Sequence, residues 1–261
     1  MLRAFSTAAT GMAGQQMVVD VIANNLANIN TSGFKRSQVD FQDLMYVKIA
    51  EAGRETAAGV IAPTGFEIGS GVHAAATTKI FTPGELEATS RELDLAIMGN
   101  GFFEVTLPDG SLRYTRDGAL QLNANRQLVT AQGHMVGSGL TIPQEATKIS
   151  IGSDGTVISH GSDGTNTNVG TLTMARFANP AGLSSEGDNL LKETEASGAA
   201  VSGTAGQDGF GAVRQGMLER ANVQMVTELV NLIKAQRAYE INSRAIRAGD
   251  EMLNTANRLI T

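Results

Sequence analysis

The three histidines are the first candidates for metal or acid–base chemistry, but their spacing supports neither. His73, His134 and His160 lie far apart, and none has a Glu-x-x-His or His-x-x-x-His neighbour of the kind that forms a zinc site. Cysteine is absent, which excludes disulfides and thiolate ligands. The sequence therefore predicts loop histidines in contact with solvent, no metal site and no cofactor.

A group of carboxylates is the next place where catalysis would be sought. Glu85, Glu87, Glu92 and Asp94 cluster around the expected start of a strand. Glycoside cleavage requires two carboxylates that face each other across a cleft. An acidic run at a strand start is more typical of a solvated sheet edge, where charge discourages unwanted pairing. We expect no catalytic residue among them.

Glycine-containing motifs give no stronger indication of an enzyme. Gly99 and Gly101 lack the third glycine and the βαβ context of a dinucleotide site, and no Gly-x-Ser-x-Gly nucleophile motif is present. The segments 152–156 and 161–165 both read Gly-Ser-Asp-Gly-Thr, a near-repeat too short for a stacked calcium-binding array. Two tight turns are the simpler interpretation, and the chain is predicted not to be an enzyme.

Composition narrows the partners and the compartment. The net charge of −6 opposes binding to nucleic acid or to an anionic membrane, because both require a basic surface. No apolar run approaches the ~18 residues of a membrane span. Polar residues follow Met1–Phe5 directly, so no signal-peptide core forms there. If the protein leaves the cytoplasm, we expect export without a cleaved signal peptide.

The elements that must carry any function begin with an N-terminal helix, which we expect to run to about Asn30. Apolar or small residues recur at alternating steps of three and four, which is a heptad pattern. Only Arg3 and Asp20 are charged before Phe34, so most sides of this helix should be covered by protein. Gly11 and Gly14 weaken the isolated helix. The seam comprises Phe5, Ala8, Met12, Gln15, Val19, Ile22, Leu26 and Ile29.

The C-terminal segment, from about Met217 to Thr261, has a matching pattern. A second stripe widens its apolar face and suggests two neighbours rather than one. A helical hairpin that closes a monomer is the alternative, but it would leave excess apolar surface in water. The seam comprises Met225, Leu229, Leu232, Gln236, Tyr239, Ser243, Ile246, Asp250, Leu253, Asn257 and Ile260, and the second stripe comprises Val223, Val226, Val230 and Ile233.

The middle of the chain predicts short strands separated by turns such as Pro108-Asp109-Gly110. We expect an α+β fold in which N- and C-terminal coiled-coil helices flank a central antiparallel, partly barrel-like β domain. Residues 51–71 fit either an extended hairpin arm or a disordered linker. The expected domains are 1–33 (N-terminal helix), 34–71 (connecting arm), 72–216 (β domain) and 217–261 (C-terminal helix).

Several segments resemble the flagellar rod and hook protein family. The stretch 23–35, ANNLANINTSGFK, is similar to the N-terminal signature of that family, and 230–253 is similar to its C-terminal helix. Gly99–Phe103 and Tyr114–Gly118 resemble its common β core. Residues 65–72 and 84–86 resemble the distal-rod members in particular. The similarity covers both ends and most of the middle.

This resemblance implies a structural subunit that polymerises helically into the distal rod, the drive shaft that transmits torque to the hook. A proximal rod or hook-type protein is the alternative within the family. The implied partners are copies of itself, proximal rod and hook proteins, and the surrounding periplasmic and outer-membrane rings. The implied location is the periplasmic rod of the basal body, reaching the outer membrane, after export through the flagellar type III apparatus.

The seams and the signature together define a predicted assembly interface. Gly33 can adopt a left-handed conformation that stops a helix, and nearby amides and hydroxyls can bond to neighbouring backbones. A frayed, Asn-rich helix end is the alternative interpretation. The predicted interface residues are Phe5, Met12, Val19, Ile22, Asn24, Asn25, Leu26, Asn28, Thr31, Gly33, Phe34, Met225, Leu229, Leu232, Gln236, Tyr239, Ile246 and Leu253.

Two hypotheses of other classes stay open on sequence grounds. A peptidoglycan-modifying enzyme near the rod would need an acid/base pair, which the sequence does not offer. An adhesive β module with trimerising helical ends would normally carry charges on the outer helix faces, which the first helix does not. Helical symmetry, protofilament number and order of assembly are not specified by the residues.

Overall fold

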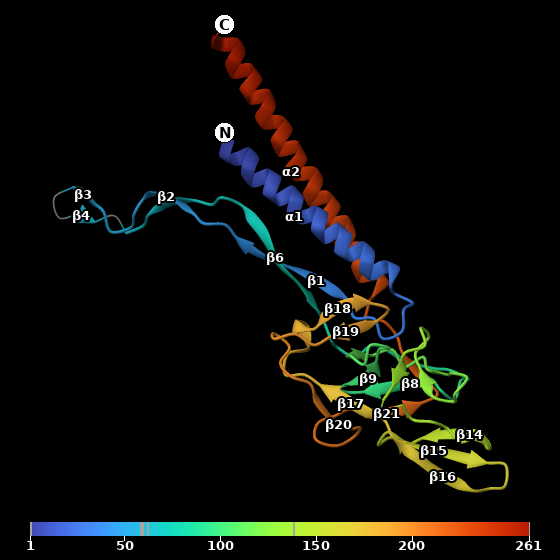
Figure 1. Ribbon diagram of the computed structural model, residues 1–261. Coiled ribbons are helices and arrows are strands. Elements are labelled where there is room, and N and C mark those ends of the chain that lie inside the picture. Colours follow the sequence, from blue (N-terminus) through green and yellow to red (C-terminus); the bar gives the residue numbers. More distant parts are fainter. Residues whose placement is uncertain (1, 58–59, 62, 138, 261) are drawn as a thin grey trace. The chain divides into compact units, whose positions relative to one another are not determined.

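The computed structural model describes residues 2–57, 60–61, 63–137 and 139–260. The chain forms two compact units (Figure 1). The helical unit comprises Met1–Leu26, Ser37–Thr78 and Gln224–Thr261, and the β unit comprises Ala27–Arg36 and Lys79–Val223. The chain therefore passes between them four times, after residues 26, 36, 78 and 223.

Two long helices dominate the helical unit. Helix α1 spans Leu2–Ala27 and helix α2 spans Met225–Ile260. They run antiparallel, because a Cβ added at Gly11 would lie 2.8 Å from Asn242 Nδ2, and one at Gly249 would lie 2.8 Å from the Phe5 ring. Figure 1 shows both termini at the same end of this pair. Glycine lowers helix propensity at Gly11 and Gly249, but the lack of a side chain there lets the other helix approach closely.

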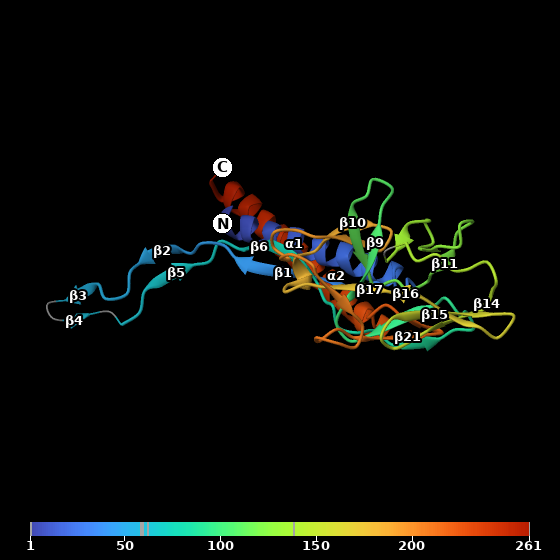
Figure 2. The ribbon, with the colours of Figure 1, turned by 60° about the horizontal axis from the view of Figure 1, so that its bottom comes forward.

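A long hairpin arm completes the helical unit. Strand β1 (Ser37–Asp43) pairs with β6 (Val72–Lys79), β2 (Val47–Ala50) pairs with β5 (Phe66–Ile68), and β3 (Glu55–Ala57) pairs with β4 (Val60–Ile61). Figures 1 and 2 show the outer part as an extended two-stranded ribbon. The structure thus adopts the hairpin-arm alternative within the described part of 51–71; residues 58–59 and 62 lie outside it.

The β unit is built on one antiparallel sheet with smaller sheets beside it. The main strand order is β11-β12-β13-β9-β10-β19-β18, and β17 pairs with both β9 and β20. These strands are β9 (Phe102–Thr106), β10 (Leu112–Thr115), β11 (Gln121–Leu122), β12 (Leu128–Val129), β13 (Met135–Val136), β17 (Thr173–Arg176), β18 (Ser184–Gly187), β19 (Leu190–Lys192) and β20 (Val201–Thr204).

The remaining strands form one three-stranded sheet and two pairs. The sheet order is β14-β15-β16, and the pairs are β21-β8 and β22-β7. Their bounds are β7 (Leu86–Ala88), β8 (Leu95–Met98), β14 (Ala146–Ile151), β15 (Thr156–Gly161), β16 (Asn166–Thr171), β21 (Ala212–Gln215) and β22 (Met217–Glu219); one 3₁₀ turn covers Pro180–Gly182.

Strand alternation gives the β unit two apolar clusters. Phe103, fully buried on β9, belongs to a large aliphatic cluster with Leu95 and Val105. Its neighbour Phe102 belongs to a second, aromatic cluster that includes Phe177. The rings of Phe102 and Phe177 meet edge to face at 5.8 Å between centroids. The main sheet therefore contributes to both clusters, and neither cluster includes a residue of α1 or α2.

The α+β expectation is confirmed: two helices flank a mostly antiparallel β domain. The partly barrel-like part of that expectation is corrected, because the described strand path ends at β11 and β18 without joining them. Helix α1 ends at Ala27, where an Asn-rich turn begins, rather than near residue 30 or 33. Within the described residues, neither helix has the length and hydropathy needed to cross a bilayer.

Candidate assembly interface

Helix α1 offers few charges and few large exposed side chains. Ile22 is buried, with 5% of its side chain exposed, and Phe5, Met12, Val19 and Leu26 are half-buried. Part of this side is covered by the chain itself, since Phe5 packs on Gly249 of α2. Part of the seam therefore packs within one chain, and its half-buried residues keep some surface exposed.

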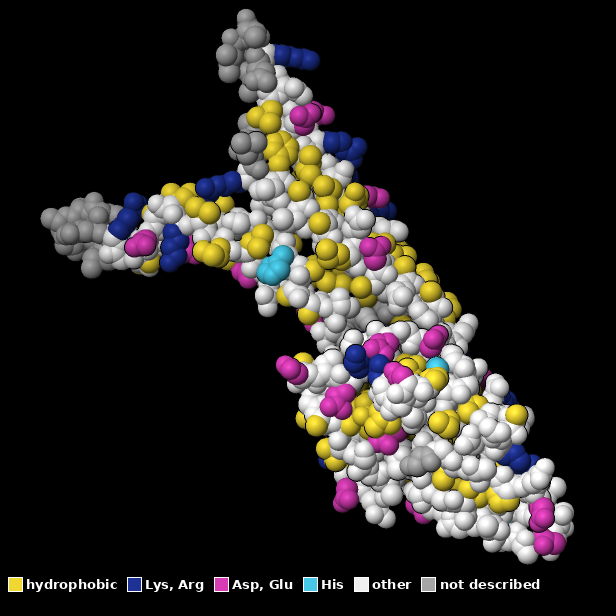
Figure 3. Space-filling view, in the orientation of Figure 1, with side chains coloured by type: hydrophobic (Ala, Val, Ile, Leu, Met, Phe, Trp, Pro, Cys, Tyr) yellow, Lys and Arg dark blue, Asp and Glu magenta, His cyan; other side chains and the backbone are white. Residues whose placement is uncertain are grey.

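Helix α2 exposes a long apolar stripe. Val226 is 75% exposed, Ile233 57% and Ile241 59%. Of the predicted seam, Met225, Leu229, Gln236 and Tyr239 are exposed, whereas Leu232, Ile246 and Leu253 are half-buried. Figure 3 shows hydrophobic side chains running along the visible face of the helical unit. Contiguous exposed apolar surface of this kind is typical of a protein–protein interface.

The ribbon β2–β5 has one apolar and one charged face. Val47 pairs with Ile68, and Lys48 pairs with Glu67, whose charged groups lie 4.0 Å apart. Directly opposed residues share a face and successive residues alternate. Phe66, 58% exposed and two positions before Ile68 on β5, therefore lies beside it on the apolar face. A two-stranded ribbon with an uncovered apolar face is poorly stable alone.

The predicted asparagines occupy different environments. Asn25 is 1% exposed, and its side-chain amide donates to Ser37 O and accepts from Ser37 N, both at 2.9 Å. Its hydrogen-bonding groups thus join the end of α1 to the start of β1. Asn24 is exposed, and Asn28 and Thr31 are half-buried in the following turn, where Thr31 Oγ1 donates to Asn28 Oδ1 at 3.1 Å.

Gly33 lies in the connector 27–36, where a larger residue would not fit. Its φ of +67° is left-handed, as expected from the sequence, although it shapes a turn beyond the end of α1 rather than ending the helix. A Cβ here would lie 2.6 Å from the backbone of both Arg116 and Asp117. Its N–H donates to Glu219 O at 2.8 Å. Phe34, which follows, is half-buried with Lys79 Nζ 6.0 Å from its ring centre.

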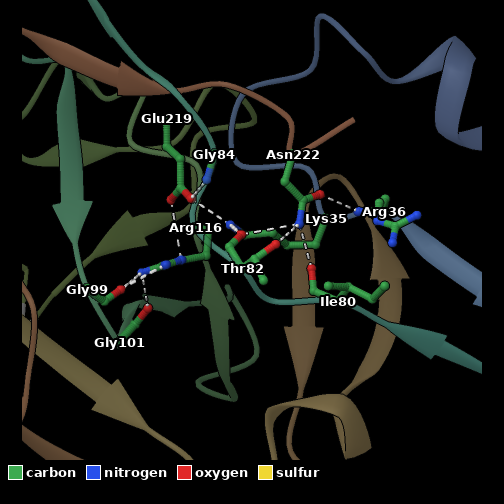
Figure 4. A network of polar contacts seen from close by, with 10 residues as sticks. All are labelled: Lys35, Arg36, Ile80, Thr82, Gly84, Gly99, Gly101, Arg116, Glu219 and Asn222. Carbon is green, nitrogen blue, oxygen red and sulfur yellow. Dashed lines mark hydrogen bonds and ion pairs between the residues drawn. The ribbon is translucent and has the colours of Figure 1, made fainter. Parts of the chain in front are cut away.

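Lys35 leads from this turn into a buried polar network (Figure 4). Its Nζ lies 2.5 Å from Glu219 Oε1 and donates to Thr82 O at 2.8 Å. The same Oε1 accepts the N–H of Gly84 at 2.9 Å. Arg116 Nε lies 3.4 Å from the other oxygen, Glu219 Oε2. The side chains of Lys35 and Glu219 are 3% and 1% exposed, so the ion pair is almost completely shielded from solvent.

Arg116 also links two of the motifs identified in the sequence. Its Nη1 donates to Gly99 O at 2.9 Å and to Gly101 O at 2.8 Å. The motif Tyr114–Gly118 therefore binds the motif Gly99–Phe103 through one guanidinium, and the connector through Glu219. Three segments that resemble the family signature converge in this network.

The network holds two cations and one carboxylate. Burial lowers the pKa of Lys35, with Glu219 opposing that shift and Arg116 adding to it. Burial also lowers the pKa of Arg116, again opposed by Glu219. Removing the carboxylate would leave two buried cations without a counter-ion, which is far more costly than the pair is stabilising.

Sequence reasoning missed Glu219 and its neighbour Asn222. Glu219 ends the short strand β22, 184 positions after its partner Lys35. A single carboxylate after two apolar residues has no periodic or motif signal. Only the fold identifies it, by placing it beside two basic residues from other segments.

The other candidates for chemistry remain dispersed. His73 is exposed, His134 is half-buried, and His160 Nδ1 contacts Asn166 Oδ1 at 2.6 Å. Among the described residues, no three His, Cys, Asp or Glu side chains gather in a way that would hold a metal ion. Asp154 and Asp163 each bond to the Thr two positions later, which makes their segments tight turns.

Comparison with known proteins identifies the family. Family models match residues 5–35 (flagella basal body rod protein), 96–159 (flagellar hook protein FlgE/F/G D1 domain) and 214–259 (flagellar basal body rod FlgEFG protein C-terminal). The chain is 45% identical to the flagellar basal-body rod protein FlgG of Borreliella burgdorferi over 99% of both chains. It is 45% identical to FlgG of Caulobacter vibrioides, also over 99% of each. The chain belongs to the FlgG family of flagellar basal-body rod proteins.

Membership of the FlgG family confirms the resemblance seen in the sequence. FlgG of Buchnera aphidicola from Acyrthosiphon pisum adds a further match, 44% identical over 96% of both chains. The chain is a structural subunit of the distal rod of the flagellar basal body and not an enzyme. The hypothesis of a peptidoglycan-modifying enzyme is thereby set aside.

Proposed function

We propose that this FlgG-family chain polymerises with copies of itself through its helical unit, while the β unit serves as a preformed block. The observation that carries the proposal is the uneven distribution of apolar surface. Large exposed hydrophobic side chains occur mainly on α2 and the ribbon, whereas those of the β unit are mainly buried in its two clusters. Burial of such surface is the main driving force of association.

The helices supply the axial contact in this proposal. The heptad spacing of α2 suits knobs-into-holes packing against a helix of another copy, which would make a coiled-coil assembly. The pairing of α1 with α2 inside one chain leaves the stripe at Val226, Val230 and Ile233 uncovered in the described structure. A head-to-tail contact of this kind generates a helical filament when it does not close into a ring.

The ribbon supplies a second contact. Its apolar face, with Val47, Phe66 and Ile68, has the size and exposure of a surface that becomes covered on association. The charged face with Lys48 and Glu67 would then remain in water. We infer that the ribbon of one copy lies on another copy, which adds contacts that the helices alone do not supply.

The proposed position of the polymer in the flagellum follows from membership of the FlgG family. The polymer would join proximal rod proteins at one end and the hook at the other, and would transmit torque between them. Periplasmic and outer-membrane ring proteins would surround it.

A pair of matched substitutions tests the proposal. Val226→Asp introduces a charge on α2, and Val201→Asp introduces one on the β unit at a side chain that is 53% exposed. Both monomers should fold and melt like the unchanged protein, because both sites face water. In cells that lack the native protein, Val226→Asp should give no hooks and no swimming, since an unpaired charge would be buried in the polymer. Val201→Asp should support both.

Hook counts by electron microscopy and swimming in soft agar provide the measurements. Normal hooks in the Val226→Asp strain would show that α2 is not an assembly surface. Loss of hooks in both strains, with normal protein levels, would show that the β unit assembles as well and would reject the division between the units.

A further inference from the structure

The β unit receives the chain from the helical unit in three separate segments. These are the connector 27–36, the segment 79–84 that follows β6, and the segment 219–223 that precedes α2. Every covalent link between the two units leaves the β unit through one of them. Any force carried along the backbone from one unit to the other must therefore pass through these segments.

Asn222 joins the segments through its side chain. Its Oδ1 accepts the backbone N–H of Arg36 at 2.8 Å. Its Nδ2 donates to Ile80 O at 2.7 Å, and also to Thr82 O at 3.2 Å and Thr82 Oγ1 at 3.0 Å. One amide thus holds the connector with its acceptor and the segment 79–84 with its donors.

Glu219 repeats this arrangement three residues earlier. Its carboxylate pairs with Lys35 of the connector and accepts the N–H of Gly84, and its carbonyl oxygen accepts the N–H of Gly33. The backbones approach so closely that a Cβ on Gly84 would overlap the carbonyl oxygen of Arg220. Both residues that join the three segments therefore come from the last six positions before α2.

These bonds lie beside the aromatic cluster of the β unit. Arg116, which pairs with Glu219, has its Cζ 5.7 Å from the ring centre of Phe102, and Phe81 of the segment 79–84 packs against the same cluster. A buried ion pair is weak support for overall stability, since desolvation offsets most of its attraction, but it can fix one arrangement of the groups around it. The network is better suited to setting the spacing of three chain segments than to stabilising the sheet.

We propose that Glu219 and Asn222 form a clamp that holds the three linking segments at fixed spacing, and that this clamp bears the load as torque passes between the units. The role rests on the proposed function as a torque-transmitting rod subunit. Glu219 and Asn222 are then positioning residues for that function, because they act by keeping the linking segments from moving independently.

Hydrogen exchange of the full-length monomer tests the clamp directly. Asn222→Ala should accelerate exchange in 27–36 and 79–84 by roughly ten-fold, because several side-chain hydrogen bonds are lost there. Exchange in the core segment 95–106 should change by less than about two-fold. Asn168→Ala is the matched control, because the side chain of Asn168 on β16 accepts the N–H of Gly170 within its own strand among the described residues.

Asn222→Asp separates the two halves of the clamp. A carboxylate can still accept the Arg36 N–H but cannot donate to Ile80 O or Thr82 O. Exchange should therefore rise in 79–84 and stay nearly unchanged in 27–36. Glu219→Gln, with Glu186→Gln at a surface pair as its control, should release the connector instead, because Lys35 loses its counter-ion. Equal acceleration everywhere, or none in the linking segments, would overturn the proposal.

Motility under load distinguishes this inference from the proposed function. Asn222→Ala strains should build hooks in normal number but lose speed several-fold more steeply than the parent as the viscosity of the medium is raised. Equal loss of speed would overturn the load-bearing role. If the unchanged protein itself failed to restore rods in a strain lacking it, the proposed function would fail, while the exchange results would still decide whether the clamp exists.

Discussion

The two units of this chain use apolar residues in opposite ways. In the helical unit, Ile22 and Ala235 are the buried apolar side chains among the described residues, whereas α2 and the ribbon expose many large ones. In the β unit, Leu95, Phe103 and Val105 belong to a cluster whose buried members are at most 8% exposed. A unit that buries little offsets the conformational entropy of ordering only narrowly. The β unit therefore has its own core within one chain, whereas the helical unit keeps apolar surface that we propose is covered in the polymer.

The sharpest test of this difference compares the same substitution in both units. Phe103→Ala should lower the free energy of unfolding of the β unit by about 3–5 kcal/mol, because a fully buried ring leaves a cavity. Phe66→Ala on the ribbon should change it by less than about 0.5 kcal/mol, because that ring is exposed in the monomer. Thermal melts of the two purified monomers provide the comparison, and similar losses in both would contradict the division into units.

Ile22→Asp tests whether α1 contributes to the stability of the β unit. Ile22 is buried within the helical unit, so an unpaired carboxylate there should disorder α1 and its packing at a cost of a few kcal/mol. Circular dichroism at 222 nm should fall while the melting temperature of the β unit stays the same. Leu232→Asp, at a half-buried site on α2, should give a smaller loss of helicity. In cells, neither variant should form hooks. A lowered β-unit melting temperature would place α1 in its core.

Gly33→Ala tests how tightly the connector fits the β unit. Alanine at a left-handed φ costs about 1–2 kcal/mol, and the added Cβ would in addition overlap the backbone of Arg116. Gly110→Ala is the matched control: its φ is also left-handed, at +81°, but no atom lies within 4 Å of the added Cβ. We expect Gly33→Ala to destabilise clearly more than Gly110→Ala in urea unfolding. Equal losses of stability in the two variants would mean that the connector shifts to make room for the added Cβ.

The smallest expected effect is a loss of stability at alkaline pH. Burial, with the nearby carboxylates of Glu193 and Glu104, raises the pKa of Tyr114 to about 12. The folded state then keeps a proton that the unfolded state releases above pH 10, so stability should decline between pH 10 and 12 by on the order of 1–2 kcal/mol. Tyr114→Phe should flatten this decline when urea unfolding is measured across this pH range. An unchanged decline would assign it to other groups.

Elements that depend only on residues nearby in the sequence could be predicted from it. The alternating three- and four-residue steps of α1 and α2, and the near absence of charge before Phe34, depend only on neighbours along the chain. Turn sequences such as Pro108-Asp109-Gly110 likewise mark strand ends, and β9 and β10 lie on either side of that turn. The expected end of α1 was too late, because the seam continues to Ile29 while the Asn-rich turn stops the helix at Ala27.

The sequence by itself determined the helical ends, the strand-rich middle and the kind of surface that would need partners, because those properties are written in local periodicity and composition. Tertiary structure alone decided that Lys35, Arg116 and Glu219 share one buried site, since contacts between residues so distant along the chain leave no local pattern. It also decided that Val47 lies opposite Ile68 on the ribbon, because strand pairing sets that register. Strand pairing and chain crossings thus decide which distant segments meet, and the proposed interface and clamp depend on those meetings.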